Sequence, residues 1–160
     1  MGKIAIYPGS FDPVTYGHLD VLQRAAAIFG NVIIAVANNT SKNYIFSLKE
    51  RVQLLEEATS GMKGVKVESF DGLVIDYAHL KKTNVLIRGM RMTSDFDYEF
   101  QIALTNRRLA QDIETVFLMP SGPHSFLSSS LLKEVAVFKG DISSFVPPCV
   151  AKALKERLKK

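Results

Sequence analysis

Tyr7-Pro-Gly-Ser-Phe-Asp-Pro-Val-Thr-Tyr-Gly-His18 is the stretch that decides the fold of this chain of 160 residues. The short apolar run Lys3–Tyr7 leads into it and has the β-branched character of a buried strand. Apolar residues at helical spacing follow it as far as Phe29. The stretch is therefore predicted to be a strand-to-helix turn, in which Gly9 is free to adopt positive φ.

This turn carries groups that suit a phosphate ligand. A loop at a helix N-terminus exposes backbone N–H groups where the partial positive charge favours an anion. Ser10 and Thr15 add hydroxyls, and His18 falls in the first turn of the helix. An ordinary turn with a half-buried histidine is the alternative, but so many polar groups after the first strand favour a functional site. His18 is the leading candidate for a catalytic group.

Composition points to one soluble globular domain. Hydrophobic residues make up 47% of the chain and charged residues 22%. No apolar run approaches the ~20 residues needed to cross a bilayer, and the N-terminus does not resemble a signal peptide. We therefore expect a cytoplasmic protein without a membrane partner. The single cysteine, Cys149, has no intrachain disulfide partner and reads as a small apolar residue at a helix start.

The net charge of +4 is modest, and much of it falls in residues 152–160, where a solvated helix is favoured over a nucleic-acid-binding face. We expect no nucleic-acid partner. No group of Cys, His and carboxylates has zinc-ligand spacing. The absence of Walker and Gly-x-Gly-x-x-Gly motifs argues against a P-loop kinase or a dinucleotide dehydrogenase.

Strand and helix patterns alternate along the whole chain. Further strands are predicted at Val32–Ala37, Val65–Ser69, Asn84–Arg88 and Thr115–Met119, and further helices from Ser47, over Leu73–His79, over Asp95–Gln111 and from Ser128. This alternation predicts an α/β fold, a Rossmann-like doubly wound sheet of five parallel strands with helices on both faces. Residues 1–160 are predicted to form a single domain, with the helices after about residue 128 packing on the sheet or at a subunit interface.

Chemistry-bearing residues follow each predicted strand. In a doubly wound sheet the ligand binds outside the carboxyl ends of the strands, near the point where strand order reverses. The residues in question are Ser10 and His18, then Lys42, then Asp71, then Arg88 and Arg91, and finally His124 with the serine cluster. Their positions therefore predict one shared site.

The arginine pair Arg88-Gly-Met-Arg91 is suited to phosphate oxygens, because guanidinium groups make paired hydrogen bonds and keep their charge. Surface ion pairs to Asp95, Asp97 or Glu99 are the alternative, and these would contribute little to stability. Arg88 closes an otherwise apolar strand, so a half-buried charge there needs an anionic partner.

Three serines, Ser128 to Ser130, begin the helix after a proline-bounded loop. Helix capping accounts for one of them. Three consecutive hydroxyls beside free helix N–H groups better fit a triphosphate.

Two of these segments resemble the signatures of the nucleotidyltransferase superfamily. Gly9-x-Phe-Asp-Pro-x-Thr15-x-Gly-His18 is similar to its Gly-x-Phe-Asp-Pro-x-(His/Thr)-x-Gly-His motif, and residues 127–133 are similar to Ile-Ser-Ser-(Thr/Ser)-x-x-(Arg/Lys), with Leu127 for isoleucine. Thr15 in the first motif, with Lys42 and the Arg88 region, resembles the phosphopantetheine adenylyltransferase family. The resemblance covers nearly the whole chain.

This resemblance implies transfer of AMP from ATP to 4′-phosphopantetheine, giving dephospho-coenzyme A and pyrophosphate, by direct in-line attack. It implies Mg²⁺ held mainly by phosphates, no protein metal ligands, coenzyme A as a further ligand, and a homohexamer built from two trimers. The implied catalytic residues are His18, Lys42, Arg88 and Ser10. The implied phosphopantetheine contacts are Ser10, Lys42, Asp71, Val74 and Arg88. The implied ATP contacts are Ser10, Phe11, His18, Gly89, Met90, Arg91, Glu99, His124, Ser125, Phe126, Leu127, Ser128, Ser129 and Ser130.

Two other functions stay open at this point. A non-catalytic nucleotide-binding module can be built on the same sheet, since fold alone does not fix function. A nucleotidyltransferase acting on another phosphate, such as nicotinamide mononucleotide or glycerol 3-phosphate, is the closer alternative.

Overall fold

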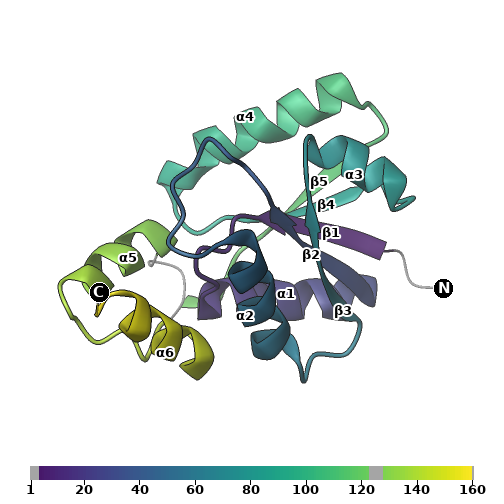
Figure 1. Cartoon of the computed structure of the whole chain (residues 1–160). Helices are drawn as coiled ribbons and strands as arrows, with labels where there is room; N and C mark the ends of the chain where they lie inside the picture. The colour runs from purple at the N-terminus through teal and green to yellow at the C-terminus, as the bar shows by residue number, and fades with distance from the viewer. Residues whose placement is uncertain (1–3, 123–127, 160) are drawn as a thin grey trace.

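The computed structural model describes residues 4–122 and 128–159 and contains one sheet of five parallel strands (Figure 1). The strand order is β3-β2-β1-β4-β5. The strands are β1 (Ile4–Gly9), β2 (Asn31–Ala37), β3 (Val65–Phe70), β4 (Val85–Gly89) and β5 (Glu114–Leu118). The predicted doubly wound α/β fold is confirmed.

Helices cover both faces of the sheet (Figure 1). One face carries α1 (Tyr16–Phe29), α2 (Leu48–Thr59), α5 (Ser129–Val137) and α6 (Pro148–Arg157), and the other carries α3 (Val74–Leu80) and α4 (Thr93–Leu109). Two hydrophobic clusters correspond to these faces. The first joins β1 and β2 to side chains of α1, α2, α5 and α6, and the second joins the opposite side of the strands to α3.

Local sequence signals account for the element boundaries. Ile34 of β2 lies in the first cluster, while Ile33 and Ala35 lie in the second, as expected for a continuous apolar strand buried on both faces. Gly30 ends α1 with a φ of 80°. Ser47 caps α2 through the predicted capping box with Glu50, and both reciprocal hydrogen bonds are present.

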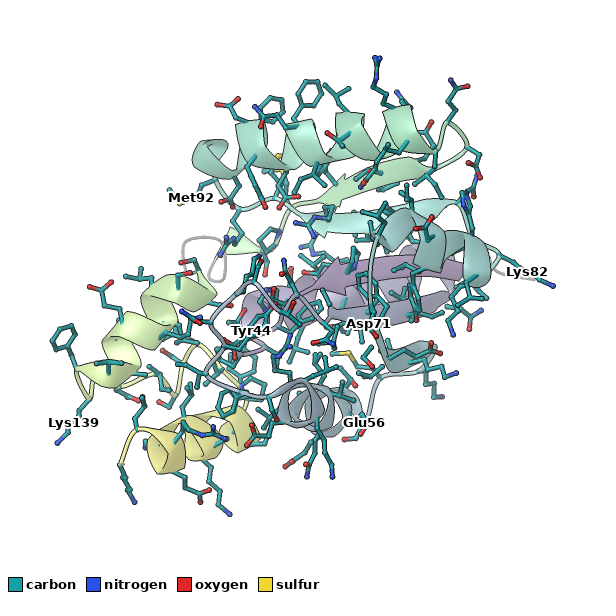
Figure 2. The ribbon with its side chains drawn as sticks, turned by 45° about the horizontal axis from the view of Figure 1, so that its top comes forward. Tyr44, Glu56, Asp71, Lys82, Met92 and Lys139 are labelled. Atoms are coloured by element: carbon teal, nitrogen blue, oxygen red, sulfur yellow. The ribbon has the colours of Figure 1, made fainter. Side chains whose placement is uncertain are left out.

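The strand order reverses between β1 and β4, so the turns that leave these two strands diverge at the centre of the sheet. Figure 2 places Tyr44, in the loop after β2, and Met92, after β4, beyond the carboxyl ends of the strands. Lys82, in the loop before β4, lies at the opposite edge. The fold thus gathers the segments predicted to carry the chemistry on one side.

Helix α4 leaves much of its apolar face uncovered. Phe96, Phe100 and Leu104 are between 45% and 49% exposed. The Phe96 and Phe100 rings stack on each other, with their centroids 5.4 Å apart. Within the described part of the chain, no helix is long and apolar enough to span a membrane.

Candidate active site

A cavity of about 300 Å³ opens at the carboxyl ends of the strands. Segments far apart in the sequence line it: the turn after β1, the loop after β2, the end of β4 and the start of α5. Its polar side chains include Ser10, His18, Lys42, Arg88, Arg91, Glu99, Ser129, Ser130 and Lys133, with Asp12, Thr15 and Asn43. The structure thus brings together most of the residues that the sequence places after separate strands.

His18 occupies the N3 position of helix α1 and belongs to a capping box with Thr15. The Thr15 backbone N–H donates to His18 Nδ1 at 3.1 Å, and the Thr15 hydroxyl accepts from the His18 backbone N–H at 3.3 Å. Because Nδ1 is an acceptor here, the neutral ring carries its proton on Nε2. His18 therefore offers a single N–H donor.

The charge state of His18 is set by its surroundings. Burial, together with the positive charges of Arg91 and Arg88, lowers the pKa of His18 from 6.5 to about 4. The imidazole is neutral at physiological pH before any phosphate enters the cavity.

The turn after β1 adopts its unusual path at Phe11 and not at Gly9. Phe11 has a φ of 47°, whereas Gly9 does not adopt positive φ, contrary to the sequence-based expectation. Gly9 is needed for space, because a Cβ there would lie 2.9 Å from the Phe11 ring. That ring packs edge-on against Tyr7 and His18, with centroid distances of 5.4 and 5.1 Å. The strained residue is thus held by aromatic contacts beside the catalytic candidate.

Arg88 forms a paired interaction with Glu99. Its Nε and Nη2 donate to the two carboxylate oxygens, each at 2.6 Å, and Nη1 donates to the Pro8 carbonyl at 3.1 Å. Burial lowers the pKa of the Arg88 guanidinium, but the bonds and charge of Glu99 outweigh it and the pKa is raised. The anionic partner that Arg88 needs is therefore Glu99, one of the alternatives that the sequence leaves open.

Arg91 lies nearby and contacts Asp95, with Nε 3.2 Å from a carboxylate oxygen. Both arginines line the cavity. Lys42 lines it as well, and across residues 4–122 and 128–159 no carboxylate forms an ion pair with its ammonium group.

Asp12 joins three parts of the cavity wall. It is buried, and its two oxygens accept hydrogen bonds from the backbone N–H groups of Ile45 and Phe46, both at 2.9 Å. Lys133 of α5 contacts the same carboxylate at 3.3 Å. Asp12 therefore ties the first turn to the loop that carries Lys42 and to α5.

The same loop is held from behind by two arginines. Arg157, in the last turn of α6, donates to the Ile45 carbonyl at 3.1 Å and pairs with Glu50. Arg51 of α2 is buried, and its guanidinium carbon lies 3.9 Å from the centroid of the Tyr44 ring. The loop is thus anchored on the side away from the cavity.

The three serines at the start of α5 have different contacts. Ser128 caps α5 by accepting from the Leu131 N–H at 3.0 Å, which accounts for one serine as expected. The Ser129 hydroxyl donates to the Pro13 carbonyl at 3.2 Å, and Ser129 and Ser130 line the cavity. The predicted ATP contacts His124, Ser125, Phe126 and Leu127 lie outside the described residues.

Four predicted contacts among the described residues fall outside the cavity lining: Ser128, which caps α5, and Asp71, Val74 and Met90. Asp71 accepts a hydrogen bond from the Asn38 amide at 2.7 Å, and Val74 begins α3. Met90 donates its backbone N–H to the Leu118 carbonyl at 3.0 Å. Phe11 and Gly89 do line the cavity.

Sequence reasoning assigned no role to Tyr7, Asp12, Arg51 or Lys133. Asp12 and Lys133 belong to the two quoted motifs, so their motif positions were an available signal. Tyr7 is buried, and burial, opposed by Arg88 and Arg91, raises its pKa. The signal for Arg51 was its place on the apolar stripe of α2, three residues after Leu48.

The chain is similar to known proteins over almost its whole length. A sequence profile described as cytidylyltransferase-like matches residues 6–135. A protein of Caldanaerobacter subterraneus subsp. tengcongensis named phosphopantetheine adenylyltransferase is 51% identical over 158 residues, covering 99% of both chains. A protein of Geobacter metallireducens with the same name is 49% identical, and the match covers 99% of this chain and 97% of the other. A protein of Geobacter sulfurreducens, again with that name, is 51% identical, and the match covers 97% of this chain and 94% of the other.

Among solved structures, a Vibrio parahaemolyticus protein described as a nicotinate-nucleotide adenylyltransferase superposes with a TM-score of 0.73. The match covers 99% of this chain and 95% of the other, at 17% sequence identity. At that identity the likeness concerns the fold alone.

Proposed function

Because the chain belongs to the phosphopantetheine adenylyltransferase family of cytidylyltransferase-like proteins, we propose that it transfers AMP from ATP to 4′-phosphopantetheine, in the cytoplasm. The products are dephospho-coenzyme A and pyrophosphate. The observation that carries the proposal is the cavity itself, where Lys42, Arg88 and Arg91 surround a neutral His18. Cationic and hydrogen-bonding groups so arranged suit two phosphate-bearing substrates.

The acceptor phosphate attacks the α-phosphorus in line, so the protein supplies no nucleophile and acts by positioning and charge stabilisation. We assign the Nε2–H of His18 to an α-phosphate oxygen, where charge develops in the transition state. Ser10, which lies in the turn before His18 and also lines the cavity, is assigned to the same phosphate. A neutral donor suits this step, since it can bind the developing charge without losing a proton.

The acceptor phosphate is assigned to Lys42 and Arg88. The bond to Glu99 neutralises most of the Arg88 charge, so Lys42 supplies the uncompensated positive charge at this end of the cavity. The β- and γ-phosphates are assigned to Arg91, Ser129 and Ser130.

The adenosine is assigned to the backbone around Gly89, where a Cβ would approach the Tyr7 hydroxyl to 3.4 Å. Glu99 is bonded to Arg88, so it reaches a ribose only if that pair rearranges. The pantetheine arm is assigned to the edge of the cavity toward Asp71 and Val74.

We assign Mg²⁺ to the phosphate oxygens of the nucleotide, because Mg²⁺ keeps several waters and needs few protein ligands. The donor set of the cavity supports this. Asp12 is bonded to Ile45, Phe46 and Lys133, and Glu99 is bonded to Arg88. Within the described ranges, no cluster of three His, Cys or carboxylate residues is arranged to hold a metal ion. The metal neutralises phosphate charge when it is bound.

Self-association into a hexamer of two trimers is part of the proposal. It is supported by the apolar face of α4, where Phe96, Phe100 and Leu104 remain about half exposed. Light scattering of the purified protein at micromolar concentration tests it. A wild-type protein with the mass of a monomer would contradict self-association. An oligomer whose mass is the same in Phe100→Asp would contradict association through α4.

Pyrophosphate release is the experiment that decides the function. The protein is mixed with ATP and Mg²⁺, and 4′-phosphopantetheine, nicotinamide mononucleotide and glycerol 3-phosphate are supplied in separate reactions. CTP replaces ATP in a parallel series. We expect pyrophosphate only with ATP and 4′-phosphopantetheine. Turnover with another acceptor would reassign the substrate, and ATP binding without any pyrophosphate would make the protein a nucleotide-binding module.

A further inference from the structure

Arg51 is a buried cation behind the phosphate-binding turn. Its side chain projects from α2, and the residue is only 1% exposed. Nη1 donates to the Ser10 carbonyl at 2.7 Å and to the Ala37 carbonyl at 3.1 Å. Among the ion pairs of the described residues, none includes Arg51, and its Nε is buried without a hydrogen-bond partner. Burying a cation without a counter-charge is costly, so this arrangement points to a role beyond stability.

The bond to the Ser10 carbonyl fixes the orientation of one peptide group. In a trans peptide, the C=O and the N–H of the next residue point in opposite directions. Holding the Ser10 carbonyl toward α2 therefore turns the Phe11 N–H away from α2, on the side where Ser10 and Phe11 line the cavity. Within the described part of the chain, the Phe11 N–H has no hydrogen-bond acceptor.

This orientation has to be maintained against a conformational preference. Phe11 has a φ of 47°, which non-glycine residues adopt only when the surroundings impose it. The Arg51 bond is one such constraint. The Tyr44 ring packs over the guanidinium and so connects Arg51 to the loop of Lys42. Both cavity-lining segments on this side thus depend on one side chain.

We propose that Arg51 is a positioning residue: it holds the Ser10–Phe11 peptide so that the Phe11 N–H is preorganised to bind a substrate phosphate. The phosphate as ligand rests on the proposed function. Arg51 does not line the cavity, so its effect passes through the peptide and through Tyr44. A preorganised backbone donor aimed at developing charge contributes on the order of a hundredfold to the rate.

A merely stabilising arginine would affect folding but not the turn, so the test follows the Phe11 amide directly. Isotope-labelled protein is titrated with inorganic pyrophosphate, and the Phe11 amide resonance is followed by NMR in wild type, Arg51→Lys and Arg51→Met. Steady-state kinetics and thermal unfolding are measured on the same samples. Arg107→Met is the matched control, because Arg107 is exposed and pairs with Glu114 away from the cavity.

In the wild type and the control we expect a large shift of the Phe11 amide. In Arg51→Met we expect that shift to be lost and kcat/KM to fall about a hundredfold. Arg51→Lys keeps the charge but loses the planar guanidinium that packs against the Tyr44 ring, so about a tenfold loss is expected.

A folded Arg51→Met with the wild-type amide shift and kcat/KM overturns the proposal. If Arg51→Met does not fold, Arg51→Lys decides: a wild-type Phe11 amide shift and a wild-type kcat/KM in that variant overturn the proposal. A silent Phe11 amide in the wild type, with normal pyrophosphate release in the acceptor assay, refutes this inference while leaving the proposed function intact.

Discussion

Replacing His18 with glutamine should remove a specific pH-dependence of stability. The pKa of His18 is about 4 in the folded protein and 6.5 in its unperturbed state. A depressed pKa contributes stability that is fully present above 6.5 and is lost as the pH falls toward 4. Between about pH 8 and about pH 5 the unfolded imidazole takes up a proton while the folded one does not, which costs the native state about 2 kcal/mol.

Glutamine isolates this effect, since Gln at N3 is itself a capping-box residue and can accept the Thr15 N–H. Urea unfolding followed by circular dichroism gives the free energy of unfolding of both proteins at the two pH values. The wild type should lose about 2 kcal/mol more than His18→Gln on acidification, because other titrating groups are common to both. Equal losses in the two proteins would refute the depressed pKa of His18.

Three further substitutions test the cavity. Glu99→Gln should lower the free energy of unfolding by about 3 kcal/mol, measured in urea, because it leaves Arg88 half-buried without its counter-charge; a loss below about 1 kcal/mol would indicate a surface-like pair. Lys42→Met should raise KM for 4′-phosphopantetheine about tenfold or more in steady-state kinetics while leaving KM for ATP nearly unchanged; an effect on ATP alone would move Lys42 to the nucleotide. His18→Ala should lower kcat about a hundredfold or more and, by loss of the capping bond, reduce Tm by a few degrees; a normal rate would remove the imidazole from the mechanism.

The alternation of strands and helices was enough to predict the parallel sheet, because each βαβ unit has one favoured hand. The place of the site followed as well, because ligands bind outside the carboxyl ends of the strands in such a sheet. The element boundaries shifted by a few residues. Helix α4 runs over Thr93–Leu109, whereas the sequence predicted Asp95–Gln111. The helix after the first turn begins at Tyr16, three residues before its first inward leucine, Leu19.

Long-range contacts were beyond sequence reasoning. Nothing local distinguishes Asp12 as the acceptor for two N–H groups more than 30 residues away, or Asp20 as the partner of Ser121. The apolar pattern of α4 likewise predicts a hydrophobic side but not what covers it. Arg51 is the instructive case, since a charged residue on a core-facing stripe reads as an exception until its carbonyl partners are known.

The bond from Arg157 to the Ile45 carbonyl has a practical consequence for anyone handling this protein. The final turn of α6 is mechanically joined to the loop of Lys42, although the two are more than a hundred residues apart in sequence. An affinity handle or surface attachment that loosens the last turn of α6 is therefore expected to disturb the loop of Lys42. Kinetic constants from such preparations should be compared with those of protein freed of the handle.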